Sequence, residues 1–259
     1  MNRPTPFAVL ALIGASALAG ACDVHAQRAA AEGTFERTLQ VGRTPEVHVS
    51  GRSGSIRVWS GAEGTVQIRA RIQAYEDADL FFSYTPAERV KELESHPPID
   101  QHGDDISIGD TDDWMLLQHV SITYEITVPP NTRLTTVTRS ATQTITAIAG
   151  SVAATTRSGS ISIDGAGGPL RLESRSGDVT IAGEPRDSWE VQTRSGDVEL
   201  RIPPAAGFDV SVASRSGDIE TGRALSTSRR STRNRLEGRA GAGGPRVDVA
   251  TRSGSIRFE

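Results

Sequence analysis

The sequence has few of the residues that hold small exported domains together or bind metals. Its 259 residues include one cysteine, Cys22, and five histidines. A lone cysteine leaves no intramolecular disulfide and no cysteine-based zinc site. None of the histidines lies between residues 131 and 259, and those before it are irregularly spaced. Packing and backbone hydrogen bonds must therefore hold the domain together, and we expect no cofactor and no metal.

Aromatic residues and lysine are also scarce. Phe, Trp and Tyr make up 5% of the chain, the formal net charge is -4, and Lys91 is the only lysine. Few aromatic side chains to stack on bases and a net acidic chain argue against nucleic-acid binding. The 26 glycines instead favour many short strands joined by turns.

No apolar run is long enough to span a membrane. The longest, residues 7–18, follows Arg3 and has the length of a signal-peptide core. We expect residues 1–26 to be a signal peptide, with a mature start at Gln27. The alternative is a loose lipoprotein signal, AGAC, in which Cys22 is lipidated and supplies the only membrane attachment. Either reading predicts an exported protein of the periplasm or cell envelope.

A hexamer of the type Thr-Arg-Ser-Gly-Ser-Ile occurs six times. Its arginines from residue 157 onward are 18, 19, 21 and 37 residues apart, so the repeat is about 19 residues long and the last gap approaches two periods. Glycine provides the positive φ that a tight corner needs. The predicted corner glycines are Gly54, Gly159, Gly177, Gly196, Gly217 and Gly254.

Apolar residues alternate with polar ones on both sides of each corner, as in half-buried strands. The near-constant period predicts an all-β fold, a β-solenoid resembling a single-stranded β-helix, in which Val198 and Ile219 stack on successive coils. The Thr or Ser before each arginine should form an internal ladder. The alternative is an antiparallel hairpin meander or sandwich, with Val191 opposite Leu200.

The hexamer is predicted to be a structural corner, because its repetition and the absence of histidine from the repeat region do not suit a catalytic triad. Its arginines could still form a surface-binding ladder that engages a repeating polymer. The members of this predicted ladder are Arg157, Arg175, Arg194, Arg215 and Arg252.

Residues 27–130 have a different organisation from the repeat region, residues 131–259. An insertion at about 74–118 carries 12 acidic and 2 basic residues. The pattern Thr85-Pro86-Ala87-Glu88 predicts a capped helix through Ser95. An acidic loop from Asp100 to Asp113 should follow, without the spacing of an EF-hand. The stretch 114–117, WMLL, should dock the insertion on the core.

The repeat motifs resemble those of a bacterial putative-adhesin family. The resemblance is carried by VPPNTRLTTVTRS at 128–140, TTRSGSISIDGAGG, LESRSGDVTIAG and VQTRSGDVEL, and covers roughly 120–259 and the unit at 47–58. It implies an exported β-strand-repeat protein whose function is largely undefined.

We therefore expect a non-enzymatic, adhesin-like scaffold of the cell envelope that binds a polymer, a wall component or a protein partner. The alternative is a polysaccharide lyase or hydrolase on the same scaffold, with carboxylates from the insertion at Asp104, Asp105, Asp112 and Asp113. We also expect the coil that ends at Phe258 to be the last in the stack, either shielded by the unit at 47–58 or left open.

Overall fold

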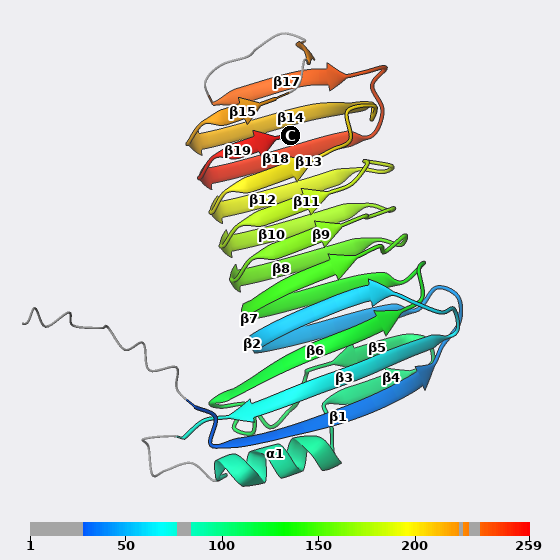
Figure 1. The fold of residues 1–259 in the computed structure, drawn as a ribbon, viewed down its shortest axis with the longest axis vertical. Helices are drawn as coiled ribbons and strands as arrows, with labels where there is room; N and C mark the ends of the chain where they lie inside the picture. The colour runs from blue at the N-terminus through cyan, green and yellow to red at the C-terminus, as the bar shows by residue number, and fades with distance from the viewer. Residues whose placement is uncertain (1–27, 77–83, 223–224, 228–233) are drawn as a thin grey trace, which may run out of the picture.

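The computed structural model shows an elongated stack of β-coils, closed at one end by a helix (Figure 1). It describes residues 28–76, 84–222, 225–227 and 234–259. The expected signal peptide and Cys22 lie outside these residues. The all-β solenoid with a short helix-containing insertion is confirmed.

The elements before the repeat region are β1 (Ala31–Gln40), β2 (Glu46–Ser60), β3 (Thr65–Ala74), α1 (Pro86–Ser95), β4 (Ile99–His102), β5 (Asp105–Ile108) and β6 (Val120–Val128). The repeat region contains β7 (Arg133–Thr146), β8 (Val152–Ser158), β9 (Ile161–Asp164), β10 (Leu170–Ser176), β11 (Val179–Ala182), β12 (Trp189–Ser195), β13 (Val198–Arg201), β14 (Phe208–Ser216), β15 (Ile219–Thr221), β16 (Ser226–Thr227), β17 (Arg235–Ala240), β18 (Arg246–Ser253) and β19 (Ile256–Phe258).

Each coil consists of a strand, a hexamer corner and a second strand. The strands before the corners form a first face, and the strands after the corners form a second face; β2 and β7 bend through the corner and contribute to both. Neighbouring coils pair in parallel and in register, so that Val191 aligns with Leu172 and with Val249. The hairpin alternative is wrong, because Val191 pairs with these neighbouring coils and not with Leu200.

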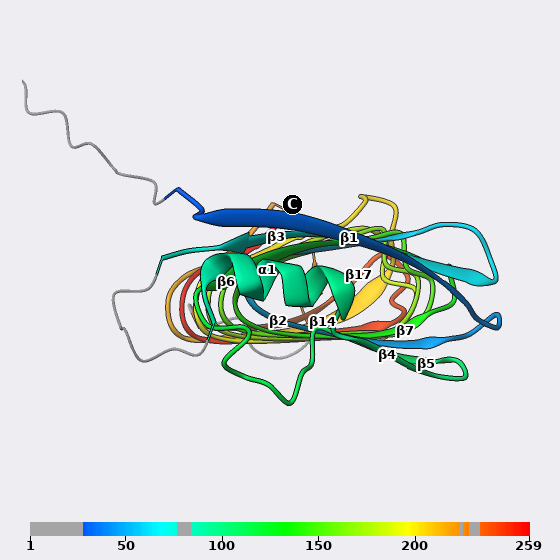
Figure 2. The ribbon, with the colours of Figure 1, turned by 90° about the horizontal axis from the view of Figure 1, so that it is seen from below.

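The core lies between the two faces, which enclose a flattened oval when viewed along the stack (Figure 2). The alternating apolar residues point into it: Leu172, Val191 and Leu200 are fully buried. Each such side chain contributes roughly 1.5–3 kcal/mol on leaving water. Because every coil repeats the same inward positions, the core is continuous along the stack.

The coils do not stack in the order of the sequence. The C-terminal coil, β18/β19, lies between β12/β13 and β14/β15: Val198 pairs with Ile256, and Ile256 pairs with Ile219. The spatial order is β2, β7, β8/β9, β10/β11, β12/β13, β18/β19 and β14/β15. The expected direct stacking of Val198 on Ile219 is therefore wrong.

The predicted end of the stack is wrong for the same reason. Beyond β14 the chain returns as β17, which pairs antiparallel with the free side of β14, and β16 pairs with β17. The coil ending at Phe258 therefore has a coil on either side. The unit at 47–58 is far from it, because β2 pairs with β7 near the other end.

At that other end, β6 extends the second face through a parallel pair with β2, β3 and β1 follow through antiparallel pairs, and α1 covers β1 and β3. The predicted helix is confirmed with its capping box between Thr85 and Glu88. Its buried residues include Val90 and Leu93. Gly33 permits the close approach, because a Cβ there would lie 2.4 Å from a methyl carbon of Val90.

The acidic segment after α1 is not the continuous loop that we expected. It contains the antiparallel hairpin β4–β5, and β5 pairs in parallel with the first half of β2. Ile106 and Ile108 are fully buried, and polar residues alternate with them. The insertion thus adds a strand to the stack, and its acidic residues occupy the outward positions and the turns.

Candidate functional site

The arginines of the corners form a single column along one side of the stack. The residues before and after them pair in register from coil to coil, as Thr193 does with Thr251 and Ser195 with Ser253. We call this column the arginine edge. In spatial order it consists of Arg52, Arg139, Arg157, Arg175, Arg194, Arg252 and Arg215.

Five members of the arginine edge belong to the ladder predicted from the sequence, and the structure adds Arg52 and Arg139. Arg52 lies in a hexamer of its own, and Arg139 lies in a degenerate copy, Arg139-Ser140-Ala141. The sequence signal was therefore present. Arg52 and Arg139 were not assigned to one ladder because the insertion lies between them. These two neighbours in the stack are 87 positions apart in the sequence.

The geometry of the corner directs the arginines outward. The Thr or Ser before each arginine points inward and is buried in the repeat coils, where its hydroxyl is hydrogen-bonded. Thr138 donates to Thr156 over 3.0 Å, and Thr193 donates to Thr251 over 2.8 Å. This confirms the predicted internal ladder. Because successive side chains of a strand point to opposite sides, the next residue, arginine, faces solvent.

The corner glycines fix the distance between coils. Gly177, Gly196, Gly217 and Gly254 have φ between 144° and 151°, and Gly54 has a φ of 111°. Gly159 is not among the positive-φ glycines, but a Cβ there would lie 2.3 Å from the carbonyl oxygen of Ala141. Strand neighbours lie about 4.8 Å apart, so seven arginines span about 29 Å.

None of the seven arginines forms an ion pair within the described part of the chain. Arginines elsewhere on the coils do: Arg171 lies 2.8 Å from Glu190, and Arg257 lies 3.1 Å from Glu220. Two of the corner aspartates bind backbone amides and not these arginines. Asp178 accepts from the amide of Asp197 over 2.9 Å, and Asp197 accepts from that of Ser255 over 2.7 Å.

On the flank away from the corner aspartates, the surface beside the arginine edge carries little negative charge. Two residues before the arginines stand Ser50, Val137, Thr155, Glu173, Gln192, Ala250 and Ala213. Glu173 is the only acid among them, and it is bonded to Arg171 over 2.9 Å. An exposed serine directly follows each arginine, as Ser176 and Ser195 do. The edge therefore presents a row of uncompensated guanidinium groups beside a row of hydroxyls.

This arrangement is suited to holding acidic groups that repeat along a chain. Guanidinium binds carboxylate or phosphate through two parallel hydrogen bonds. Neighbouring unit charges at this spacing repel by about 0.9 kcal/mol in water, and a bound polyanion relieves that repulsion. A shallow groove of about 310 Å³ runs along the middle of the edge between Thr155 and Arg194.

The acidic residues suggested for catalysis do not form a common site. Asp104 accepts a hydrogen bond from the amide of Gly42 over 2.7 Å, and Asp113 accepts from the Tyr84 hydroxyl over 2.9 Å. Asp105 lies 3.7 Å from His48, and the carbonyl oxygen of Asp112 accepts a hydrogen bond from the amide of Trp114 over 3.1 Å. The described residues contain no group of three His, Cys, Asp or Glu side chains placed to hold a metal ion.

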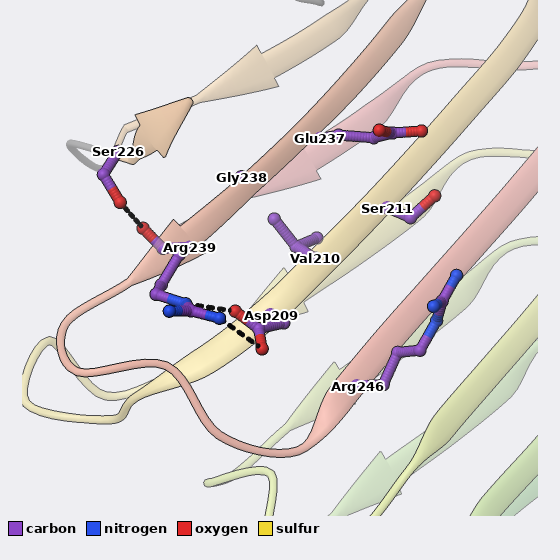
Figure 3. A pocket seen from close by; sticks show the side chains of 8 residues that line it. All are labelled: Asp209, Val210, Ser211, Ser226, Glu237, Gly238, Arg239 and Arg246. Atoms are coloured by element: carbon purple, nitrogen blue, oxygen red, sulfur yellow. Dashed lines mark hydrogen bonds and ion pairs between the residues drawn. The ribbon is translucent and has the colours of Figure 1, made fainter. Parts of the chain in front are cut away.

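A cavity of about 570 Å³ lies on the outer surface of β14, β17 and β18 (Figure 3). Arg239 and Asp209 point toward each other there and are 2.6 Å apart. The hydrogen bond from Arg239 holds the pKa of the Asp209 carboxyl below its usual value. The charged side chains of this cavity are paired, since Arg246 also lies 2.6 Å from Asp248.

Comparison with known proteins identifies the repeat region. Residues 131–259 match the family model Toastrack DUF4097. The repeat region is a Toastrack domain. The search of curated proteins gives no match. Within the described residues, no helix is long and apolar enough to cross a membrane.

Solved structures resemble the chain at low identity. A "putative cell adhesion protein" from Clostridium sporogenes is 12% identical with a TM-score of 0.44, covering 87% of this chain and 99% of that chain. A "putative adhesin" from Bacteroides fragilis is 11% identical with a TM-score of 0.36, covering 88% and 97%. A "putative lipid binding protein" from Parabacteroides distasonis is 8% identical with a TM-score of 0.32, covering 87% and 96%.

Proposed function

We propose that this Toastrack protein is a non-enzymatic, exported component of the cell envelope that binds an extended anionic polymer along the arginine edge. Seven in-register arginines without ion-pair partners in the described residues carry the proposal. The signal-peptide pattern of residues 1–26 supports export, with either Gln27 or a lipidated Cys22 as the mature N-terminus.

A binding role suits the rigidity of the site. The backbone behind the edge is hydrogen-bonded through each corner: the amide of Gly177 donates to Ser195, and that of Gly196 donates to Ser253. A surface held in this way loses little conformational entropy when a ligand binds. The polymer therefore meets a preformed row of charges at a constant spacing.

The test compares two triple variants that remove the same charge. Arg175→Ala, Arg194→Ala and Arg252→Ala together truncate the centre of the edge. The control, Arg201→Ala, Arg246→Ala and Arg257→Ala, removes three exposed arginines that pair with acids on the strands. The readout is retention on isolated envelope material and on immobilised polyanions over a series of salt concentrations.

We expect the edge variant to bind about 10- to 100-fold more weakly, because an exposed ionic contact contributes up to about 1 kcal/mol. Salt should weaken wild-type binding, since exposed charges are screened. The control should bind like the wild type. Equal losses in both variants, or no binding of any polyanion by the wild type, would refute the proposal.

A further inference from the structure

The arginine edge ends at a loop that takes the place of a corner. In the layer next to β2, β5 pairs with Glu46–Val49 and β6 pairs with Gly54–Ser60. Residues 109–119 join β5 to β6 and thus occupy the position of a hexamer, but contain no arginine. The column of arginines therefore stops at Arg52.

This loop is held tightly against β2 where it begins and where it ends. Gly109 has a φ of 88°, and a Cβ there would lie 2.0 Å from the carbonyl oxygen of Ser50. After the loop, the carbonyl oxygen of Ile122 lies 2.1 Å from the position of a Cβ on Gly54. Between these points the loop is longer than the tight corners, and Trp114 within it is 55% exposed. Residues 109–119 therefore border the end of the arginine edge, and we call this loop the wall.

A groove of about 390 Å³ lies between this wall and the first coils. Arg52, Arg139 and Arg157 contribute three positive charges to its lining, and Asp110 contributes one negative charge, so the lining has a net charge of +2. Leu117, from the loop, and Val137, which is 49% exposed, contribute apolar surface. The groove therefore combines cationic and apolar surfaces, whereas the middle of the edge is lined by polar and charged residues.

We propose that this groove binds the terminal residue of a linear acidic polysaccharide whose following residues lie along the arginine edge. The inference rests on the proposed function and makes it more specific. The arginines bind the acidic groups of the first sugars, and Val137 and Leu117 contact the apolar face of a sugar ring. The exposed serines beside the edge can hydrogen-bond sugar hydroxyls, which a polyphosphate chain lacks.

The stoichiometry of binding distinguishes end recognition from binding anywhere along a chain. The probes are oligogalacturonates of two defined lengths, about as long as the edge and about three times as long, titrated by calorimetry. End recognition predicts one protein per chain at both lengths. Stoichiometry that rises in proportion to chain length would overturn the inference while leaving the proposed function intact.

Two matched variants each place a carboxylate at the position two residues before an arginine of the edge. Val137→Glu puts it in the groove, and Gln192→Glu puts it beside Arg194, outside the groove; both native side chains are exposed, so both variants should fold. We expect Val137→Glu to abolish the limit of one protein per long chain, and Gln192→Glu to keep that limit with weaker affinity. An unchanged limit in Val137→Glu would overturn the inference.

The class of polymer is tested separately with polyphosphate. Tighter binding of oligogalacturonate than of polyphosphate of similar charge supports an acidic polysaccharide. Binding of polyphosphate without binding of oligogalacturonate would overturn the inference alone. Failure of both probes and of envelope material would overturn the proposed function as well.

Discussion

The corner glycines should be far more sensitive to substitution than a glycine in an open turn, and Gly196 provides the sharpest case. A Cβ at Gly196 would lie 2.3 Å from the carbonyl oxygen of Gly177, a backbone atom that cannot rotate away. Gly103, in the β4–β5 turn, also has a positive φ, 66°, but no atom lies within 4 Å of its Cβ position. Alanine at the two sites thus separates backbone strain from collision between coils.

The magnitudes follow from these two environments. A left-handed conformation costs an L-residue roughly 1–2 kcal/mol, and this is the full expected loss for Gly103→Ala. Gly196→Ala must also move its corner about 1 Å away from the corner of Gly177, which breaks the 3.0 Å hydrogen bond from the amide of Gly177 to the carbonyl oxygen of Ser195. A buried backbone group without a partner costs about 1–3 kcal/mol, so we expect a total loss of about 2–5 kcal/mol.

Denaturation in urea, followed by circular dichroism, measures the free energy of unfolding of both variants. Similar slopes of the free energy of unfolding against urea concentration would show that the two variants expose the same amount of surface on unfolding. If Gly196→Ala loses no more than Gly103→Ala, contact between neighbouring corners does not set the requirement for glycine.

Two further predictions test the stacking order and the paired charges. In a Cys22→Ser background, Ser195→Cys with Ser253→Cys should form a disulfide, because these residues are partners about 4.8 Å apart; Ser195→Cys with Ser216→Cys should not, and the reverse result would contradict the stacking order. Arg239→Ala should raise the pKa of Asp209 toward 3.8, which carboxyl NMR titration measures. Because the folded pKa is lowered, this pair stabilises the wild type above pH 3.8 and loses its effect as the pH falls through the folded value, so an unchanged Asp209 titration would contradict the assignment.

The fold class was predictable because its determinants are local. Alternating apolar residues, such as Val191 and Val198, lie on either side of a Ser-Gly corner. Together they specify a strand, a turn and a second strand within one repeat. The helix could be placed for the same reason, since Thr85 and Glu88 hydrogen-bond to each other across one helical turn. The β4–β5 hairpin was not predicted, because the alternation of Ile106 and Ile108 spans only four residues and lies among acidic residues.

The order of the coils could not be predicted, because the pairing surfaces are nearly equivalent. The corner at Thr251 offers β12 the same Arg-Ser-Gly sequence as the corner at Ser214. Which of them becomes the neighbour depends on long connections and on β17, which occupies the free side of β14. A local pattern contains no information about that choice.

The arginine edge was predictable as a column but not as a row of free charges. The period places Arg157, Arg175 and Arg194 on one side of any regular stack. Whether acids neutralise them depends on side-chain direction at the corner, and there Asp178 and Asp197 turn toward backbone amides of the next coil. The groove at Arg52 needed the pairing of β5 and β6 with β2, which the sequence does not reveal.

The position of β18/β19 has a consequence for how the molecule is made. A chain synthesised from its N-terminus presents β14 and β15 before the coil that separates them from β12 and β13 exists. Rung-by-rung growth in chain order would therefore bring β14 against β12, in a register that the shared corner sequence tolerates. In the native stack, β14 must either remain unpaired on that side until β18 is available or detach from β12 when β18 arrives. The strands β18 and β19 are therefore inserted between two coils whose sequences precede them.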